Sequence, residues 1–229
     1  MLVGEKMTIN VLQHTPNEGP GSIETWAKQH HHDFYVYHPY QFGILPTAQQ
    51  TDFLVILGGP MSPNDDLPWI AQERQLIKEL LDKDVPILGV CYGAQQIAKT
   101  LGCQIKKAPV KEVGWAPVEL QSDKISDLPQ ELTVLHWHEE MFEIPEEADV
   151  LFSNENLTNQ GFVLGHKAVG LQFHLEPEQN NINEIVVNDA QYIEGSVLNQ
   201  TAEQIISKSI PAANREAMFS ILNYLAKAN

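Results

Sequence analysis

Short apolar segments alternate with longer segments that carry their apolar residues on one face in the first hundred residues. The short runs predict strands at 8–12, 33–37, 53–57 and 86–90. The longer segments predict helices at 23–30, from Pro68 onward, and at 94–101. Strands without a polar face are typical of parallel sheets covered on both sides. The order of elements therefore predicts a doubly wound α/β fold with a mostly parallel sheet flanked by helices.

Two of the predicted helices have recognisable first residues. Ser22 is expected to cap the helix at 23–30, because a serine side chain accepts hydrogen bonds from the free N–H groups of a first turn. Pro68 suits the first turn of the next helix, in which Ile70, Ile77 and Leu81 share one face.

The pattern changes in the second half of the chain. Short apolar runs predict a small β extension and a return to the main sheet, with strands at 116–120, 132–137, 150–153, 161–164 and 169–173. After Glu178 the pattern is helical: Thr201 and Gln204 form a capping box, and Met218, Ile221, Leu222 and Leu225 line one face of a last helix. We expect one domain over 1–229, with an α/β core at 7–178 and a helical segment at 179–229.

The turn after the strand at 86–90 carries the main candidate nucleophile. Cys91 follows the strand directly, and Gly89 and Gly93 flank it in a G-x-C-x-G arrangement. This spacing is typical of a sharp strand-to-helix turn that exposes its central residue. At a helix N-terminus the dipole favours a thiolate, the reactive form of cysteine. A buried structural cysteine is the alternative, and the paired glycines disfavour it.

A cysteine nucleophile needs a base and a group that orients the base. His174 and Glu176 follow a predicted strand and stand two residues apart, so on an extended segment they face the same side. Glu176 can then hold His174 in the tautomer that pairs with Cys91. The alternative is a surface histidine and glutamate after a strand, and the nucleophile turn upstream favours the catalytic interpretation.

Acyl transfer also needs donors for an oxyanion. Gly58-Gly59-Pro60 ends the strand that precedes the nucleophile strand, at the sheet edge where ligands of open α/β folds bind. The Gly59 N–H and the Tyr92 N–H, which follows the nucleophile, are the candidate donors. The alternative for the glycine segment is a plain β-turn.

Other polar and aromatic residues are open to more than one interpretation. His136 and His138 share a face of a strand and resemble a metal pair, but the sequence offers no evident third ligand. We therefore expect them in a pocket wall, with no metal and no cofactor. The histidines at 30–32 are expected at a solvated helix end. Trp115 and Trp137 suit a pocket lining and a core equally well.

Composition excludes some classes of function. Asp and Glu number 30 against 14 Lys and Arg, a net charge of −16, and no basic stripe indicates nucleic-acid binding. The longest apolar runs are too short to cross a bilayer, and no leader-like start is expected. Two cysteines are too few for a disulfide framework, so a reducing cytoplasm is expected. No G-x-x-x-x-G-K-[ST] phosphate loop is present.

Several motifs occur together along most of the chain. They are Leu12-Gln13-His14 with Glu18-Gly19-Pro20-Gly21, Gly58-Gly59-Pro60-Met61-Ser62, Gly89-Val90-Cys91-Tyr92-Gly93-Ala94-Gln95, Lys111-Glu112-Val113-Gly114-Trp115, His136-Trp137-His138 and Gln172-Phe173-His174-Leu175-Glu176. With this set the chain resembles class I (triad) glutamine amidotransferases, and among them stand-alone proteins similar to the amidotransferase domain of GMP synthase. The resemblance implies a flavodoxin-like α/β fold.

The resemblance also implies a mechanism. A triad of Cys91, His174 and Glu176 would attack the side-chain amide of glutamine, release ammonia and pass through a γ-glutamyl thioester that water hydrolyses. The Gly59 and Tyr92 N–H groups would hold the tetrahedral intermediate. The expected substrate contacts are Gly58, Gln95, Trp137 and His138.

One departure bears on the substrate. Many relatives carry glycine and then aspartate after the histidine that matches His138, whereas this chain has Glu139-Glu140. Glu139 would narrow the pocket or repel the carboxylate of glutamine. The expected ligand is therefore glutamine or another γ-glutamyl small molecule.

Several alternatives remain at this stage. Ammonia would pass to a separate synthase subunit, or the protein would be a free-standing γ-glutamyl hydrolase. An α/β-hydrolase would place its acid before the histidine, which this chain does not. Proteins resembling the intracellular peptidase PfpI lack the downstream H-x-E. A catalytically idle subunit that binds a γ-glutamyl metabolite is the hypothesis from another functional class.

Overall fold

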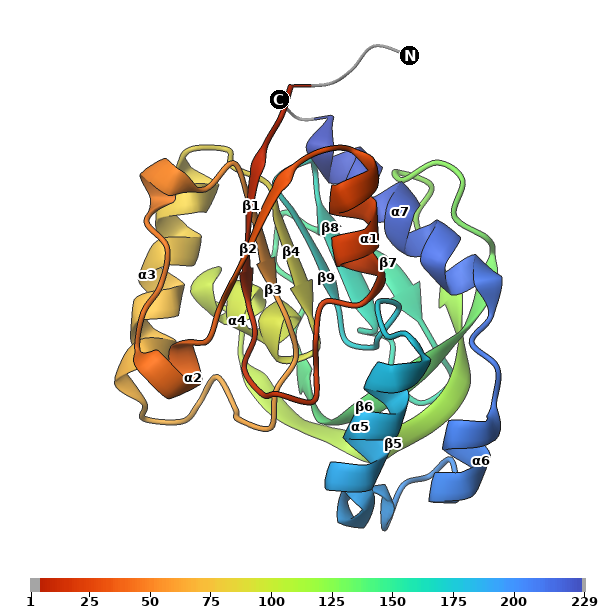
Figure 1. Ribbon diagram of the computed structural model, residues 1–229. Coiled ribbons are helices and arrows are strands. Elements are labelled where there is room, and N and C mark those ends of the chain that lie inside the picture. The colour runs from red at the N-terminus through yellow and green to blue at the C-terminus, as the bar shows by residue number, and fades with distance from the viewer. Residues whose placement is uncertain (1–4, 228–229) are drawn as a thin grey trace.

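The computed structural model describes residues 5–227, and the other residues of the predicted domain lie outside that part. Nine strands of the described chain form one sheet, in the order β2-β1-β3-β4-β9-β8-β7-β5-β6 (Figure 1). Their bounds are β1 (Thr8–Leu12), β2 (Asp33–Tyr37), β3 (Phe53–Ile56), β4 (Ile87–Val90), β5 (Ile105–Leu120), β6 (Glu131–Phe142), β7 (Asp149–Ser153), β8 (Gly161–Leu164) and β9 (Ala168–Leu171).

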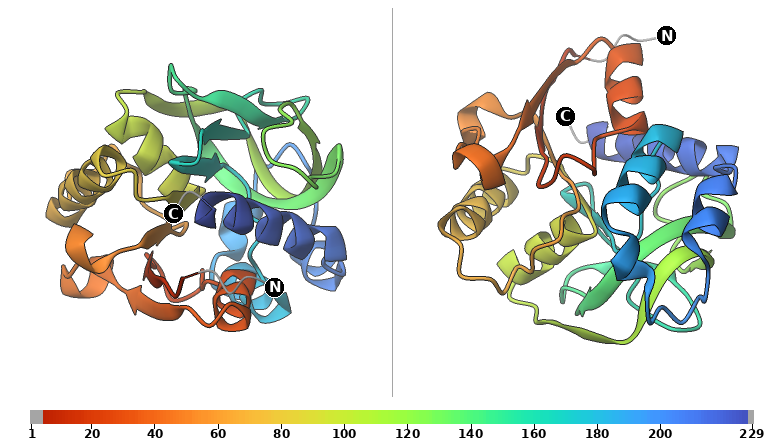
Figure 2. Two further views of the ribbon diagram at one scale, coloured as in Figure 1. Left: turned by 90° about the horizontal axis from the view of Figure 1, so that it is seen from above. Right: turned by 60° about the horizontal axis from the view of Figure 1, so that its bottom comes forward.

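Helices cover both faces of the sheet. They are α1 (Ser22–Gln29), α2 (Pro39–Phe42), α3 (Pro68–Asp82), α4 (Tyr92–Thr100), α5 (Gln179–Asn188), α6 (Ala202–Ser207) and α7 (Ala212–Ala226), with 3₁₀ turns η1 (Ala48–Gln50) and η2 (Ala190–Ile193). Figure 2 shows α1 beside α7 on one flank and α3 with α4 on the other. None of the helices in residues 5–227 is long and apolar enough to cross a membrane.

The sheet has a parallel half and an antiparallel half. Strands β2-β1-β3-β4-β9 pair in parallel, in the order of flavodoxin-like folds. Strands β3, β4 and β9 are wholly buried, as their apolar sequences predict. All strands of a parallel sheet end at one edge, so the segments after β3, β4 and β9 come together there.

The antiparallel half is larger than the small extension that the sequence predicts. The runs at 116–120 and 132–137 are parts of β5 and β6, which extend over 16 and 12 residues. Much of β5 has one exposed face, so apolar runs mark only its most buried part. The two strands pair with a register shift between Lys107 and Glu112.

Three apolar cores lie between these layers. α1 and α7 pack on one face of the sheet, with the four predicted apolar residues of α7 fully buried. α3 and α4 pack on the other face. A third core joins α5 and α6 to β5 and β6, so the helical segment after residue 178 covers the antiparallel half of the sheet.

The residues predicted to begin the helices are right in two cases and wrong in one. α3 begins at Pro68, and Thr201 and Gln204 form the predicted capping box of α6. The expected cap of α1 is wrong, because Gly21, at φ +48°, is the N-cap and Ser22 is already helical. A Cβ at Gly21 would collide with the backbone oxygen of Glu176, and that oxygen accepts from the Ser22 N–H at 2.9 Å. The close approach of α1 to the segment that carries Glu176 therefore requires glycine.

Candidate active site

Cys91 lies in a strained turn between β4 and α4. It is the N-cap of α4 with φ +49° and ψ −110°, a backbone conformation that residues other than glycine rarely adopt. A Cβ at Gly89 would lie 2.6 Å from the carbonyl carbon and oxygen of Gly93, and a Cβ at Gly93 would collide with the Ile56 carbonyl. Both glycines are therefore needed for α4 to start this close to the sheet. The geometry matches a nucleophile elbow.

His174 and Glu176 lie at the same sheet edge, after β9. His174 Nδ1 lies 2.6 Å from Glu176 Oε1, and both side chains are buried. The His174 N–H donates to the Leu135 carbonyl at 2.9 Å, and the Leu175 N–H donates to Glu176 Oε2 at 3.0 Å. The segment is therefore held from both sides, and the carboxylate fixes which ring nitrogen of His174 carries a proton on that side.

The protonation states of Cys91 and His174 depend on the burial of the two side chains and on their contact with each other. Burial raises the pKa of the Cys91 thiol, and hydrogen bonding to His174 only partly offsets this. Burial acts to lower the pKa of His174, but Glu176 and Cys91 together raise it well above its ordinary value. The expected effect of the helix N-terminus on Cys91 is therefore outweighed by desolvation in the resting site.

The candidate oxyanion donors come from two segments. Gly59 and Tyr92 both line the cavity above Cys91. Tyr92 is the first residue of α4, where the N–H has no acceptor within the helix. A Cβ at Gly59 would lie 2.7 Å from both His14 Cβ and Met61 Sδ. Gly58 lies behind this wall, where a Cβ would collide with Glu18 Oε2 and crowd His174.

A buried polar network lies behind both oxyanion segments and is centred on Glu73 of α3. Its carboxylate accepts from the Tyr92 hydroxyl at 2.9 Å and from Gln96 Nε2 at 2.8 Å, and it lies 2.6 Å from His14 Nε2. The other ring nitrogen, His14 Nδ1, lies 3.2 Å from the Leu57 carbonyl, just before the glycine pair. Glu73 therefore links the glycine loop to Tyr92.

A cavity of about 340 Å³ opens over Cys91. Of the predicted site residues, it is lined by Gly59, Cys91, Tyr92, Gln95, Trp137 and His138. Its lining also contains five carboxylate residues and no lysine or arginine; these are Glu18, Asp65, Glu139, Glu140 and Asp189. Burial and neighbouring acids, Asp65 and Glu139 among them, raise the pKa of Glu140, and burial raises that of Glu18.

Two amides connect the cavity wall to the thiol. Gln95 Nε2 donates to Gln172 Oε1 at 3.2 Å, and Gln172 Nε2 lies 3.8 Å from Cys91 Sγ. The thiol also lies 3.8 Å from the Trp137 carbonyl. Gln172 belongs to a motif that the sequence singled out, but its contact with the nucleophile was not expected.

The structure distinguishes the two tryptophans. Trp115 lies in the core under α6, where its Nε1 donates to the Ile205 carbonyl at 3.0 Å. Trp137 lines the cavity, and its Nε1 donates to Asp189 Oδ2 at 3.1 Å. Asp189 and Tyr192 reach the cavity from the end of α5 and from η2, and no motif in the sequence marks them.

Comparison with known proteins places this chain in a family. The family described as glutamine amidotransferase class-I matches residues 30–190, and the chain belongs to this family. The glutamine amidotransferase-like protein YfeJ of Salmonella typhimurium is 29% identical over 181 residues, which are 74% of this chain and 76% of YfeJ. The glutamine-hydrolyzing GMP synthase of Campylobacter lari is 31% identical over 152 residues, which are 63% of this chain and 28% of that enzyme.

Solved structures extend the likeness to almost the whole chain. A glutamine amido transferase from Methylobacillus flagellatus superposes with a TM-score of 0.90 at 26% identity and covers 98% of this chain and 96% of its own. A glutamine amidotransferase from Thermotoga maritima superposes with a TM-score of 0.86 at 28% identity, over 97% and 99% of the two chains. The predicted fold class is confirmed by these likenesses.

Proposed function

We propose that this protein hydrolyses the side-chain amide of a γ-glutamyl compound through a thioester on Cys91, with glutamine as the reference substrate. The observation that carries the proposal is the strained turn that presents Cys91 beside the buried pair of His174 and Glu176. Membership in the class I glutamine amidotransferase family supports amide hydrolysis with ammonia transfer in general.

The reaction would proceed in two stages. His174 takes the thiol proton as Cys91 Sγ attacks the amide carbon, and the Gly59 and Tyr92 N–H groups hold the oxyanion. The C–N bond breaks, His174 returns the proton to the nitrogen, and ammonia leaves. Water then loses a proton to His174 and attacks the thioester, which yields glutamate and restores the thiol.

The charge of the cavity favours a second candidate substrate. Glutamine carries an α-carboxylate, but the described lining offers five carboxylates and no lysine or arginine to receive it. Glu139 and Glu140 are two of these five carboxylates, and they follow His138 directly. A γ-glutamyl amide whose amine part carries a positive charge would complement this lining better.

The relatives suggest a protein partner for this chain, and its cysteines suggest a cellular compartment. Several relatives are GMP synthases described as glutamine-hydrolyzing, and we infer that a separate synthase subunit would accept the ammonia. Cys91 and Cys103 are both free thiols, which fits a reducing cytoplasm.

The test is an assay of ammonia and glutamate release from glutamine by the purified protein beside a Cys91→Ala control. Release that disappears in the control supports the proposal. If glutamine is inert, γ-glutamyl amides of neutral, anionic and cationic amines are assayed for release of glutamate and of the free amine. Preference for the cationic amide supports the second candidate, and inertness toward all of them would favour an idle binding subunit.

A further inference from the structure

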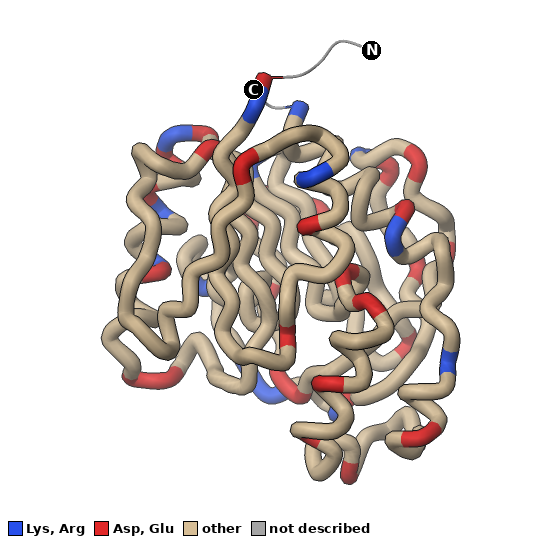
Figure 3. Tube along the Cα trace, viewed as in Figure 1, with Lys and Arg blue, Asp and Glu red and all other residues tan. Residues whose placement is uncertain are grey.

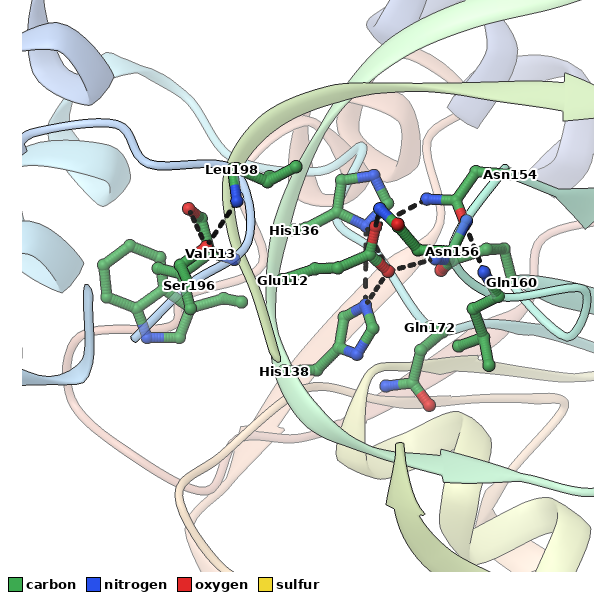
Figure 4. A network of polar contacts seen from close by, with 12 residues as sticks. Glu112, Val113, His136, His138, Asn154, Asn156, Gln160, Gln172, Ser196 and Leu198 are labelled. Atoms are coloured by element: carbon green, nitrogen blue, oxygen red, sulfur yellow. Dashed lines mark hydrogen bonds and ion pairs between the residues drawn. The ribbon is translucent and has the colours of Figure 1, made fainter. Parts of the chain in front are cut away.

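Three buried side chains from β5 and β6 converge beside the cavity, and one of them, His138, belongs to its lining. They are Glu112, His136 and His138, and each is at most 2% exposed. Figure 4 shows the two imidazoles and the carboxylate turned toward one another on one face of the two strands. The sequence suggested the two histidines as a metal pair without a third ligand. Glu112, which pairs with His138 across the two strands, supplies that third group.

The distances within this cluster fit a bound metal better than hydrogen bonds. His136 Nδ1 and His138 Nε2 are 3.4 Å apart, and Glu112 Oε2 lies 3.5 Å from the latter and 3.9 Å from the former. Good hydrogen bonds of nitrogen to oxygen are about 2.7–3.2 Å long. A point equidistant from the three atoms lies about 2.1 Å from each, which matches zinc–nitrogen and zinc–oxygen bonds of about 2.0–2.2 Å.

The Glu112 carboxylate is oriented by hydrogen bonds from amide groups, as carboxylates that bind metals usually are. Asn154 and Asn156 donate to Glu112 Oε1 at 2.7 and 3.1 Å, and Gln160 Nε2 donates to Oε2 at 2.7 Å. Such amide donors fix the orientation of a ligand without competing for the lone pair directed at the ion. Gln160 Oε1 is buried and has no partner among the described residues, so an acceptor remains on this wall.

The two imidazoles are also turned the right way. Ligation needs a free lone pair on the nitrogen that faces the ion, and each ring turns one nitrogen toward Glu112 Oε2. His136 Nε2 and His138 Nδ1 make no close hydrogen bond to another side chain in the part of the chain that the structure describes, and the backbone of Ala116 and of Glu140 interacts with the two rings. If the protons lie on these outer nitrogens, two lone pairs and a carboxylate face one another, and a cation between them would relieve the repulsion.

We propose that Glu112, His136 and His138 bind one divalent transition-metal ion, with zinc the best match. Two imidazoles and one carboxylate suit zinc, and the fourth position is left for water. The ion would fasten β6 to β5 directly behind Trp137, whose carbonyl contacts the Cys91 thiol. The ion has no step in the proposed reaction, and the proposal does not depend on which substrate the cavity takes.

The test uses the full chain, stripped with a chelator and dialysed against a trace of Zn²⁺. Metal analysis is expected to find one zinc per chain, and saturating zinc is expected to raise Tm by about 5 °C or more. Cys91→Ser removes the thiol as an alternative ligand, and His30→Ala with His31→Ala removes the exposed histidines after α1. Zinc binding is expected to be unchanged in both controls and at least about 100-fold weaker in Glu112→Gln.

X-ray absorption at the zinc edge keeps the test decisive if Glu112→Gln does not fold. Wild-type protein is expected to show two imidazoles and light N/O atoms without sulfur. Zinc that is absent, that carries a sulfur ligand, or that disappears with the exposed histidines would overturn the proposal. The cluster would then be a metal-free hydrogen-bond network.

Discussion

At the scale of single residues, Cys91 lines the cavity but has a buried thiol. Burial raises the thiol pKa above the ordinary 9.0, so the reactive thiolate increases with pH through and beyond that value. The alkylation rate of Cys91 by iodoacetamide is therefore expected to be still rising at pH 9. Peptide mass spectrometry after timed quenching measures the rate, and a plateau below pH 7 would show a thiolate in the resting enzyme.

Glu176 is the residue of the proposed triad whose charge we expect to matter most. Glu176→Gln keeps the size of the side chain but loses the carboxylate 2.6 Å from His174 Nδ1. By analogy with other triads, kcat is expected to fall by about 10³-fold or more, with a small change in KM. Glu178→Gln, an exposed acid two residues further, is the matched control and is expected to keep its activity.

At the scale of elements, Glu73 couples α3 to the two oxyanion segments. Glu73→Gln weakens and Tyr92→Phe removes the same contact, the hydrogen bond of 2.9 Å from the Tyr92 hydroxyl to the Glu73 carboxylate. Because loss of one oxyanion donor costs about 10²–10³ in kcat, misplacement of Tyr92 is expected to cost about tenfold. The double variant is expected to lose little more than either single variant, and additive losses would show that the two residues act separately.

The contact between α4 and β3 depends on Gly93. Gly93→Ala would push a methyl group into the Ile56 carbonyl, so the free energy of unfolding is expected to fall by about 2 kcal/mol. Urea denaturation measures this change. Gly19→Ala is the control, because its methyl group meets only the end of the Asn181 side chain, at 3.2 Å. Equal effects of both substitutions would refute the explanation for G-x-C-x-G.

At the scale of the whole molecule, the charge is strongly negative and the cavity shares it. Acidic positions outnumber basic ones along the trace in Figure 3, and the net charge is −16. Cys91 is therefore expected to react about tenfold more slowly with anionic iodoacetate than with neutral iodoacetamide, beyond their intrinsic difference, and salt is expected to reduce the gap. Glu139→Gln should also reduce the difference between the two reaction rates. Glu216→Gln changes the net charge equally, but at an exposed position of α7, and should leave the difference unchanged.

The sequence by itself determined the local features of the fold and of the site. Apolar runs predict the buried strands because a strand covered on both faces has no polar positions. The glycines around Cys91 and the spacing of His174 and Glu176 are equally local, since each is read within a few residues. Such signals do not depend on where the rest of the chain lies.

Only the tertiary structure decided which distant groups share a space. Asp189 reaches the cavity from the end of α5. Glu112 meets two histidines of β6 because the register of β5 places it opposite His138, and His136 lies two residues away on the same strand. The cap of α1 was also a tertiary matter, since Gly21 is required by the backbone of Glu176. The local sequence around a residue does not identify its contact partner when that partner lies on a distant strand or helix. Charge crowding in the cavity and the three-residue cluster therefore emerge only when the sheet is assembled.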